Sequence, residues 1–160
     1  MYEKNPFVLC LQETKLEFMN EQLVKTLWGD AVHNFSYQPF VGACGGLVTV
    51  WDVSQIDVTS SVSFSHVLVI KGKVLLTGED FVIFNVYASC DSEAKKILWG
   101  NLLLHIQNNN DVCICVCGDH NYVRSVDERK GRAMTFRHTD AEVYKKFIHD
   151  RLLMDLPICG

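Results

Sequence analysis

Val112-Cys-Ile-Cys-Val-Cys-Gly-Asp-His-Asn121 has the pattern of a buried strand that ends in polar groups. Its first six residues are all apolar, which is typical of a strand covered on both faces of the sheet. Polar residues follow at once, so the strand presents Asp119, His120 and Asn121 at its carboxyl end. We therefore predict a central strand with candidate functional side chains at its carboxyl end.

Two other segments have the same form. Phe7 to Leu11 is a short apolar run that stops at Gln12-Glu13, and Phe81 to Tyr87 is an apolar run that closes with Asn85 and Tyr87. Strand ends that meet at one rim of a sheet are a common way to assemble a site. Taken singly, each residue has a plainer explanation: Glu13 as a solvated strand-end carboxylate, Tyr87 as a core or rim aromatic.

The rest of the chain predicts further strands and three helices, hence an α+β fold with a two-sheet core and helices outside. Helices are expected over 20–28, from the cap Asp91 to 108–110, and over 139–152 from the cap Thr139. Core-facing residues of the second and third helices are expected to be Ile97, Leu98, Leu102, Ile106, Val143, Phe147 and Ile148. Antiparallel strands are expected over 32–40, 46–51, 56–64, 67–76 and 81–87.

Composition fits one folded domain. The 160 residues are 48% hydrophobic and 21% charged, which excludes a disordered chain, and no apolar run approaches the roughly 18 residues of a membrane span. Seven cysteines at irregular spacing, with no leader-like start, indicate reduced thiols and an intracellular protein. The net charge of −4 argues mildly against tight nucleic-acid binding, although residues 124–151 carry eight basic against five acidic side chains.

Four segments, in this order, carry a resemblance to a known family. They are Phe7-Val-Leu-Cys-Leu-Gln-Glu-Thr-Lys15, Gly42-Ala-Cys-Gly-Gly-Leu-Val-Thr-Val-Trp-Asp52, Phe84-Asn-Val-Tyr-Ala88, and Val116-Cys-Gly-Asp-His-Asn-Tyr-Val-Arg-Ser125 followed by Asp127-Glu-Arg-Lys-Gly131. The chain resembles the endonuclease/exonuclease/phosphatase superfamily domain. It is most similar to the endonuclease of plant LINE-type (non-LTR) retrotransposons, and the likeness runs from Pro6 to the last residue.

The resemblance implies a DNase I-like, four-layer α/β/β/α sandwich that hydrolyses phosphodiesters, with DNA as the expected partner and Mg²⁺ or Mn²⁺ as cofactor. Glu13 matches the family's metal ligand and Tyr87 the tyrosine near the scissile phosphate. Asp119 matches the residue that orients or deprotonates the attacking water, and Asn121 the one that hydrogen-bonds the phosphate. Asn85 and Arg124 are further candidates for substrate binding. A protein acting on genomic DNA would be nuclear.

The sequence departs from the family pattern in two respects. His120 replaces an aromatic residue that normally packs away from the site; because alternate residues of an extended segment face opposite ways, we expect it to pack opposite Asp119, the alternative being an added ligand or proton carrier. The family's first-strand Asn and its closing Ser-Asp-His have no counterpart. We therefore expect residues 1–160 to be one partial domain without the first and last strands, with little activity alone.

Alternative interpretations remain open. The chain could be an inert remnant of a retrotransposon reading frame that binds nucleic acid or protein weakly, or part of a polyprotein that also holds the missing segments and a reverse transcriptase. Gly118 to Tyr122 also resembles inositol polyphosphate 5-phosphatases, although Val123 separates Tyr122 from Arg124. Arg124 begins a basic run that could hold a nucleic-acid backbone or could be a solvated loop. Cys113, Cys115 and Cys117 share one strand face and are expected to be small core residues rather than a zinc site.

Overall fold

The computed structural model describes residues 6–40, 45–109, 112–121, 138–150, 153, 154 and 156. Within these ranges the chain forms seven strands and three helices. In chain order they are β1 (Val8–Leu11), α1 (Glu21–Trp28), β2 (Asn34–Gln38), β3 (Leu47–Trp51), β4 (Ile56–Phe64), β5 (Val67–Val74), β6 (Asp80–Tyr87), α2 (Ser92–Gln107), β7 (Cys113–Asp119) and α3 (His138–Asp150). The predicted element order is confirmed.

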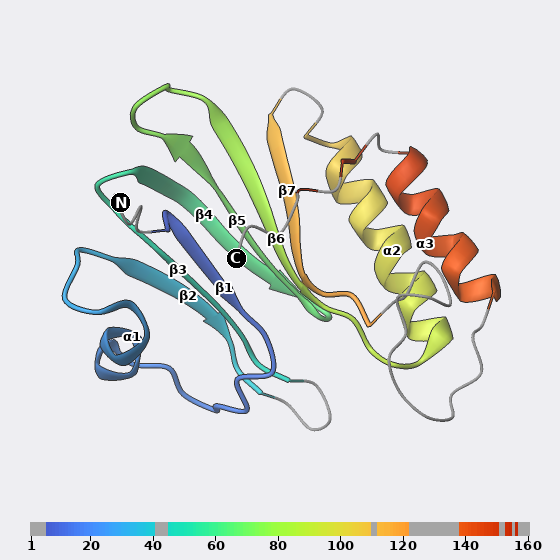
Figure 1. Cartoon of the computed structure of the whole chain (residues 1–160), viewed down its shortest axis with the longest axis horizontal. Coiled ribbons are helices and arrows are strands. Elements are labelled where there is room, and N and C mark those ends of the chain that lie inside the picture. The colour runs from blue at the N-terminus through green and yellow to red at the C-terminus, as the bar shows by residue number, and fades with distance from the viewer. Residues whose placement is uncertain are drawn as a thin grey trace.

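The strands form two sheets that face each other. The first has the order β1-β3-β2, with both pairs antiparallel. The second has the order β4-β5-β6-β7, in which β4, β5 and β6 are antiparallel neighbours and β7 runs parallel to β6 (Figure 1). Alternate residues of each strand therefore point either into the space between the sheets or to the outer face of their sheet.

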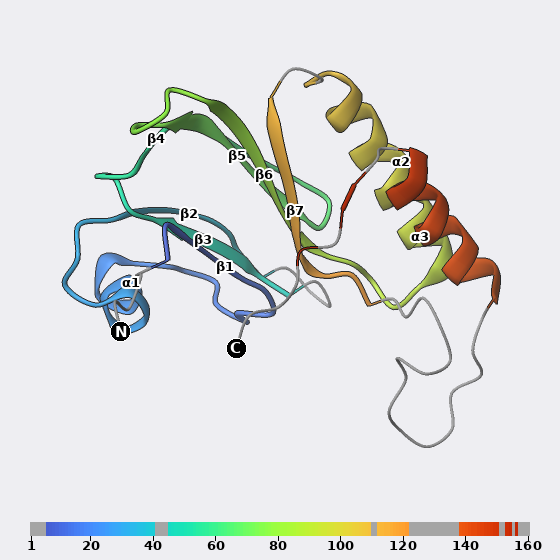
Figure 2. The same cartoon turned by 45° about the horizontal axis from the view of Figure 1, so that its top comes forward.

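Each sheet has helices on its outer face. Helix α1 packs Val24 against Val48 and Val50 of β3. Helices α2 and α3 lie side by side on the second sheet, where Trp99 and Phe147 join the core made by Phe84 and its neighbours on β5 and β6. Figure 2 shows the resulting order: α1, three-stranded sheet, four-stranded sheet, α2 with α3. The predicted four-layer α/β/β/α sandwich is confirmed.

Two details of the prediction are wrong. Within the described residues β7 is an edge strand with β6 as its neighbour, not a central strand. Its residues are apolar on both faces because one face packs toward the first sheet and the other toward the helices. An apolar pattern shows that both faces of a strand are covered, but it does not show how many strands lie beside it. Ile97 is 65% exposed, whereas Trp99 is buried in its place.

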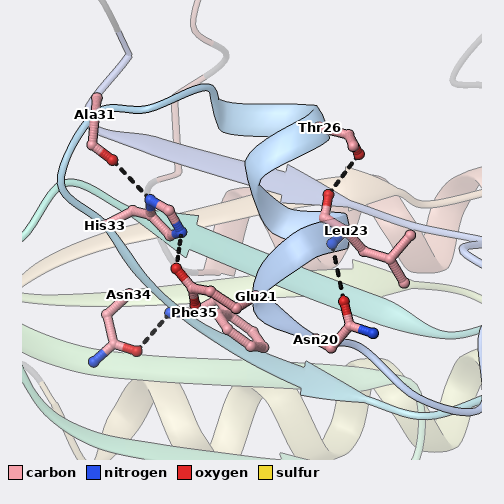
Figure 3. A network of polar contacts seen from close by, with 8 residues as sticks. All are labelled: Asn20, Glu21, Leu23, Thr26, Ala31, His33, Asn34 and Phe35. Atoms are coloured by element: carbon pink, nitrogen blue, oxygen red, sulfur yellow. Dashed lines mark hydrogen bonds and ion pairs between the residues drawn. The ribbon is translucent and has the colours of Figure 1, made fainter.

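The helix ends follow local sequence rules. The side chain of Asn20 caps α1 by accepting a hydrogen bond of 3.0 Å from the amide of Leu23 (Figure 3). Asp91 caps α2 in the same way through the amide of Ala94, as predicted. The predicted cap Thr139 lies inside α3, and its side chain is outside the described residues. None of the described helices combines the length and the apolar character that crossing a bilayer requires.

A histidine ties α1 to the segment that enters β2. The imidazole Nδ1 of His33 lies 2.7 Å from the carbonyl oxygen of Ala31, and its Nε2 lies 3.0 Å from a carboxylate oxygen of Glu21 (Figure 3). The ring is nearly buried while the glutamate is exposed. This contact fixes the first turn of α1 above its sheet.

The two sheets are joined by the side chain of Asn85, on β6. This fully buried amide donates through Nδ2 to the Val48 carbonyl at 3.0 Å, the Thr49 hydroxyl at 3.2 Å and the Leu11 carbonyl at 3.3 Å, all in the first sheet. Its oxygen accepts a hydrogen bond of 2.7 Å from the Gln12 amide. We call this set the inter-sheet clamp: Asn85, Gln12, Thr49 and the carbonyls of Leu11 and Val48.

Removing the clamp is predicted to be costly. Asn85→Ala leaves the Gln12 amide without its partner, removes the buried donor of the Thr49 hydroxyl and of two strand carbonyls, and opens a cavity; a buried group left without a partner alone costs about 1–3 kcal/mol. We expect the free energy of unfolding in urea, followed by tryptophan fluorescence, to fall by about 3 kcal/mol or more. Asn34→Ala, at the exposed start of β2, is the matched control and should cost less than about 1 kcal/mol. Equal losses in the two variants would contradict the role given to Asn85.

Candidate active site

Four of the residues singled out in the sequence come together at one rim of the two sheets. The hydroxyl of Tyr87, at the end of β6, donates a hydrogen bond to Oε1 of Glu13, which follows β1. Asp119 ends β7 opposite Tyr87 in the parallel register, so both residues face the first sheet. Asn121 joins them through the turn after β7. The predicted convergence of Glu13, Tyr87, Asp119 and Asn121 is therefore present in the fold.

The backbone at Glu13 explains why its side chain reaches the rim. Glu13 has φ +53°, in the left-handed region that most residues avoid. The neighbouring chain must come close to it: a Cβ added at Gly45 would lie 2.9 Å from Cα of Glu13 and 3.2 Å from Cε1 of Tyr87. The next glycine, Gly46, accepts a hydrogen bond of 3.1 Å from the Thr14 amide. Gly45 and Gly46, which precede β3, thus leave room for the turn that carries Glu13.

The turn after β7 is held by the end of β6. The Asn121 amide donates to a carboxylate oxygen of Asp119 at 2.8 Å, and its Nδ2 donates to the Ala88 carbonyl at 2.7 Å. The Ala88 amide donates in turn to the Asp119 carbonyl at 2.8 Å. Asn121 has φ +47°, a conformation that asparagine tolerates better than most residues. The side chains of Asp119 and Asn121 are fixed relative to each other and to the Tyr87 strand.

A buried lysine that the sequence did not reveal supports the same turn. Lys95, in the first turn of α2, is 6% exposed and donates from Nζ to the Asn121 carbonyl at 2.7 Å. Its position in an amphipathic helix gave no sign of this role, because lysine on a helix is ordinarily solvated. The contact connects the helical layer to the rim.

Gly118 must be glycine for two reasons. Its φ is +128°, and an added Cβ would lie 2.0 Å from the carbonyl oxygen of Val86. Gly78 shares a positive φ of +73° but has open space around it. We predict that Gly78→Ala lowers the free energy of unfolding by about 1–2 kcal/mol and that Gly118→Ala costs about 1–3 kcal/mol more because the backbone must shift. Urea denaturation of the two variants measures the difference, and similar losses would contradict the close approach.

The Glu13 carboxylate controls the ionisation of Tyr87. Its hydrogen bond to the phenol raises the pKa of Tyr87 to about 12, with smaller contributions from desolvation and from the negative charges of Glu13 and Asp119. Tyr87 is therefore a protonated hydrogen-bond donor at neutral pH. The contribution of Asp119 to the pKa of Tyr87 agrees with the position of Asp119 beside Tyr87.

This shift gives a pH prediction. Glu13→Gln removes both the acceptor charge and the repulsion of the phenolate, so the pKa of Tyr87 should fall from about 12 toward its ordinary 10.0. The measurement is an ultraviolet titration of tyrosinate absorbance, with Tyr87→Phe to identify the signal. If the highest midpoint is unchanged in Glu13→Gln, the contact between these side chains does not exist in solution.

The remaining predicted residues divide into three cases. Asn85 is fully buried within the inter-sheet clamp, which argues against the predicted substrate contact and indicates a structural role. Arg124 lies outside the described residues. His120 turns away from the rim as expected: its Nδ1 lies 2.5 Å from the Tyr144 hydroxyl, its ring meets Trp99 edge-on, and burial lowers its pKa against the opposing effect of Asp119.

The rim offers oxygen ligands suited to a hard divalent cation. Glu13 and Asp119 are exposed carboxylates, and Mg²⁺ or Mn²⁺ is commonly held by one or two carboxylates together with waters and substrate phosphate. Across the described part of the chain, no three His, Cys, Asp or Glu side chains surround a common point. The donor set therefore fits a water-rich site with few protein ligands, not a cation enclosed by protein.

Solved structures share this architecture. The catalytic domain of human Nocturnin with bound sulfate superposes with a TM-score of 0.65 at 17% identity, over 92% of this chain and 57% of that one. The AP endonuclease LMAP from Leishmania major gives 0.61 at 16% identity, over 91% and 57%. An endonuclease/exonuclease/phosphatase from Bacteroides vulgatus gives 0.57 at 16% identity, over 75% and 54%.

This chain has the DNase I-like fold of endonuclease/exonuclease/phosphatase proteins. It spans a little over half the length of these three structures, and at these identities the likeness establishes the fold alone. No protein-family model matches the sequence, and no curated protein sequence matches it. The resemblance to plant LINE-type endonucleases therefore remains a hypothesis about its nearest relatives.

Proposed function

We propose that the rim is the metal-dependent phosphodiester-hydrolysing site of a retroelement-derived DNA endonuclease, of which residues 1–160 are one partial domain. The observation that carries the proposal is the meeting of the Glu13 carboxylate, brought by the first sheet, with Tyr87 and Asp119, brought by the second. Polar ends of separate strands converge where a substrate can approach from solvent. Neighbours of the same fold include an AP endonuclease and a catalytic domain that binds the sulfate anion, in size and charge a stand-in for phosphate.

The roles follow from the chemistry of each group. Glu13 would hold Mg²⁺ or Mn²⁺, and the bound cation would supply positive charge to a phosphate that gains negative charge during hydrolysis. Tyr87, kept protonated by Glu13, can donate only one hydrogen, so it orients the Glu13 carboxylate and stands beside the phosphate site. Asp119 would accept a proton from water or orient it. Asn121 uses one Nδ2 hydrogen on Ala88 and keeps the other for a phosphate oxygen.

The activity of this chain alone should be low. The sequence contains no Ser-Asp-His segment, the source of the closing histidine in the resembled family. Loss of a general acid or base commonly costs about 10²- to 10⁴-fold. The missing groups would come from other segments of a longer polyprotein that also carries a reverse transcriptase. We expect such a protein to act in the nucleus.

A plasmid assay tests the proposal. Supercoiled plasmid is incubated with the chain and Mg²⁺ or Mn²⁺, and nicking is compared with Glu13→Gln, Asp119→Asn and the matched control Glu17→Gln, an exposed glutamate outside the rim. We expect slow metal-dependent nicking that Glu17→Gln retains and the two rim variants lose by about 10²-fold or more.

The second candidate is an inert remnant that binds nucleic acid or protein weakly, favoured by the small number of carboxylates at the described rim. Binding of Mn²⁺, followed by its electron spin resonance signal, separates the candidates independently of turnover. If neither Mn²⁺ binding nor nicking distinguishes Glu13→Gln from Glu17→Gln, the proposed site is wrong and the chain is the inert remnant of the second candidate.

A further inference from the structure

Three cysteines from the two sheets face one another beside the inter-sheet clamp. On β7, Cys117 pairs with Asn85 in the parallel register, so its side chain points toward the first sheet, as Asn85 does. Cys115 lies two residues earlier on the same face. On β1, Cys10 pairs with Thr49, and Thr49 points toward the second sheet because its hydroxyl accepts from Asn85. The sheet geometry alone therefore directs Cys10 and Cys117 into the same space.

The contacts agree with this geometry. Cys117 is a close enough neighbour of Cys10 and of Cys115 to act on the pKa of both thiols. Sγ of Cys10 also lies 3.9 Å from Oγ1 of Thr49, and Sγ of Cys117 lies 3.6 Å from the Phe84 carbonyl. Cys10, Cys115 and Cys117 are partly exposed, so the prediction that the β7 cysteines Cys113, Cys115 and Cys117 are small buried core residues is wrong. Cys113, further along the face, is exposed.

The neighbouring thiols also bias which sulfur is reactive. The interaction with the Cys117 side chain lowers the pKa of Cys10, and it lowers the pKa of Cys115 to about 7. Thiolates, not thiols, are the species that react with peroxides and disulfides. Cys10 and Cys115 are therefore activated toward oxidation.

We propose that Cys10 and Cys117 form an oxidative modification site, in which a peroxide converts the two thiols into a disulfide that joins β1 to β7. The thiolate sulfur of Cys10 attacks hydrogen peroxide, forming a sulfur–oxygen bond, breaking the oxygen–oxygen bond and giving sulfenic acid with release of hydroxide. Cys117 then attacks the sulfenic sulfur, its proton leaves with the departing hydroxyl as water, and the disulfide forms. Two sulfurs lose two electrons, and one peroxide is reduced.

Geometry favours Cys10 over Cys115 as the partner of Cys117. Residues two apart on one strand have Cα atoms about 7 Å apart, at the limit beyond which a disulfide cannot close without backbone movement. Cys10 comes from the first sheet. Packed sheets ordinarily lie about 10 Å apart, but β1 and β7 converge until their Cα atoms come within 8 Å of each other. Cys113 is four residues from Cys117 and farther still. The expected product therefore crosses the sheets.

The site lies close to the rim. Cys10 is three residues before Glu13, and Cys117 is two residues before Asp119. A bond between them would fix the strand ends that bring the two carboxylates together. Its formation does not depend on any activity of the rim, so it can be tested separately from the proposed function.

The test maps disulfides in the whole chain. Reduced protein is treated with a small excess of hydrogen peroxide at neutral pH, free thiols are blocked, and non-reduced peptides are analysed by mass spectrometry. We expect a mass loss of about 2 Da for the two hydrogens, a linked pair of peptides containing Cys10 and Cys117, and full reversal by dithiothreitol. The same treatment in urea should give no preference for this pair, because the preference comes from the fold.

Variants sharpen the result. Cys10→Ser and Cys117→Ser cannot form this pair and should each give about tenfold less total disulfide after the same treatment, whereas Cys113→Ser, on the same strand face but exposed, should leave the amount unchanged. Mapping in the unaltered chain needs no variant, so a variant that fails to fold leaves the test intact. Oxidation of Cys10 without a link to Cys117, a dominant link between other cysteines, or equal linking in urea would each overturn the proposal.

Discussion

The side chain of Asn85 holds the two sheets in the relation on which the rest of the structure depends. Sheets that pack through apolar side chains alone can slide, since dispersion and hydrophobic contacts have little direction. Hydrogen bonds to the Val48 carbonyl, the Thr49 hydroxyl and the Gln12 amide are directional, and burial makes each expensive to lose. They fix the register of β6 against β1 and β3 at one point. Glu13 and Tyr87 meet because they lie immediately beyond that point.

Much of the fold could be predicted from local sequence. Apolar runs with abrupt polar ends identified β1, β6 and β7, and the expected helix over 20–28 and the cap Asp91 marked helix starts that the structure confirms. The four residues expected to converge do so. These successes share one cause: the signals lie within a few residues of the element they describe.

The failures share the opposite cause. Ile97 was expected to face the core, but the face of α2 is decided by the sheet beneath it, and Trp99 occupies that side. The role of Asn85 as a clamp, and that of Lys95 as a support for the Asn121 turn, depend on partners far away in sequence. The glycines at 45 and 46 are explained only by how closely the Glu13 turn approaches them. Contacts of this kind leave no periodic trace in the chain.

The contacts of the inter-sheet clamp and of the rim join residues far apart in the sequence, and this determines when they can form during synthesis. Gln12 and Asn85 are 73 positions apart, and Tyr87 and Glu13 are 74 apart. Closing loops of that length is entropically unfavourable and slow compared with forming local turns and helices. During synthesis, β1 must wait for β6 to leave the ribosome, and Asp119 arrives later still. The rim can therefore be assembled only after residue 121 has been synthesised, later than α1 and α2 but before α3.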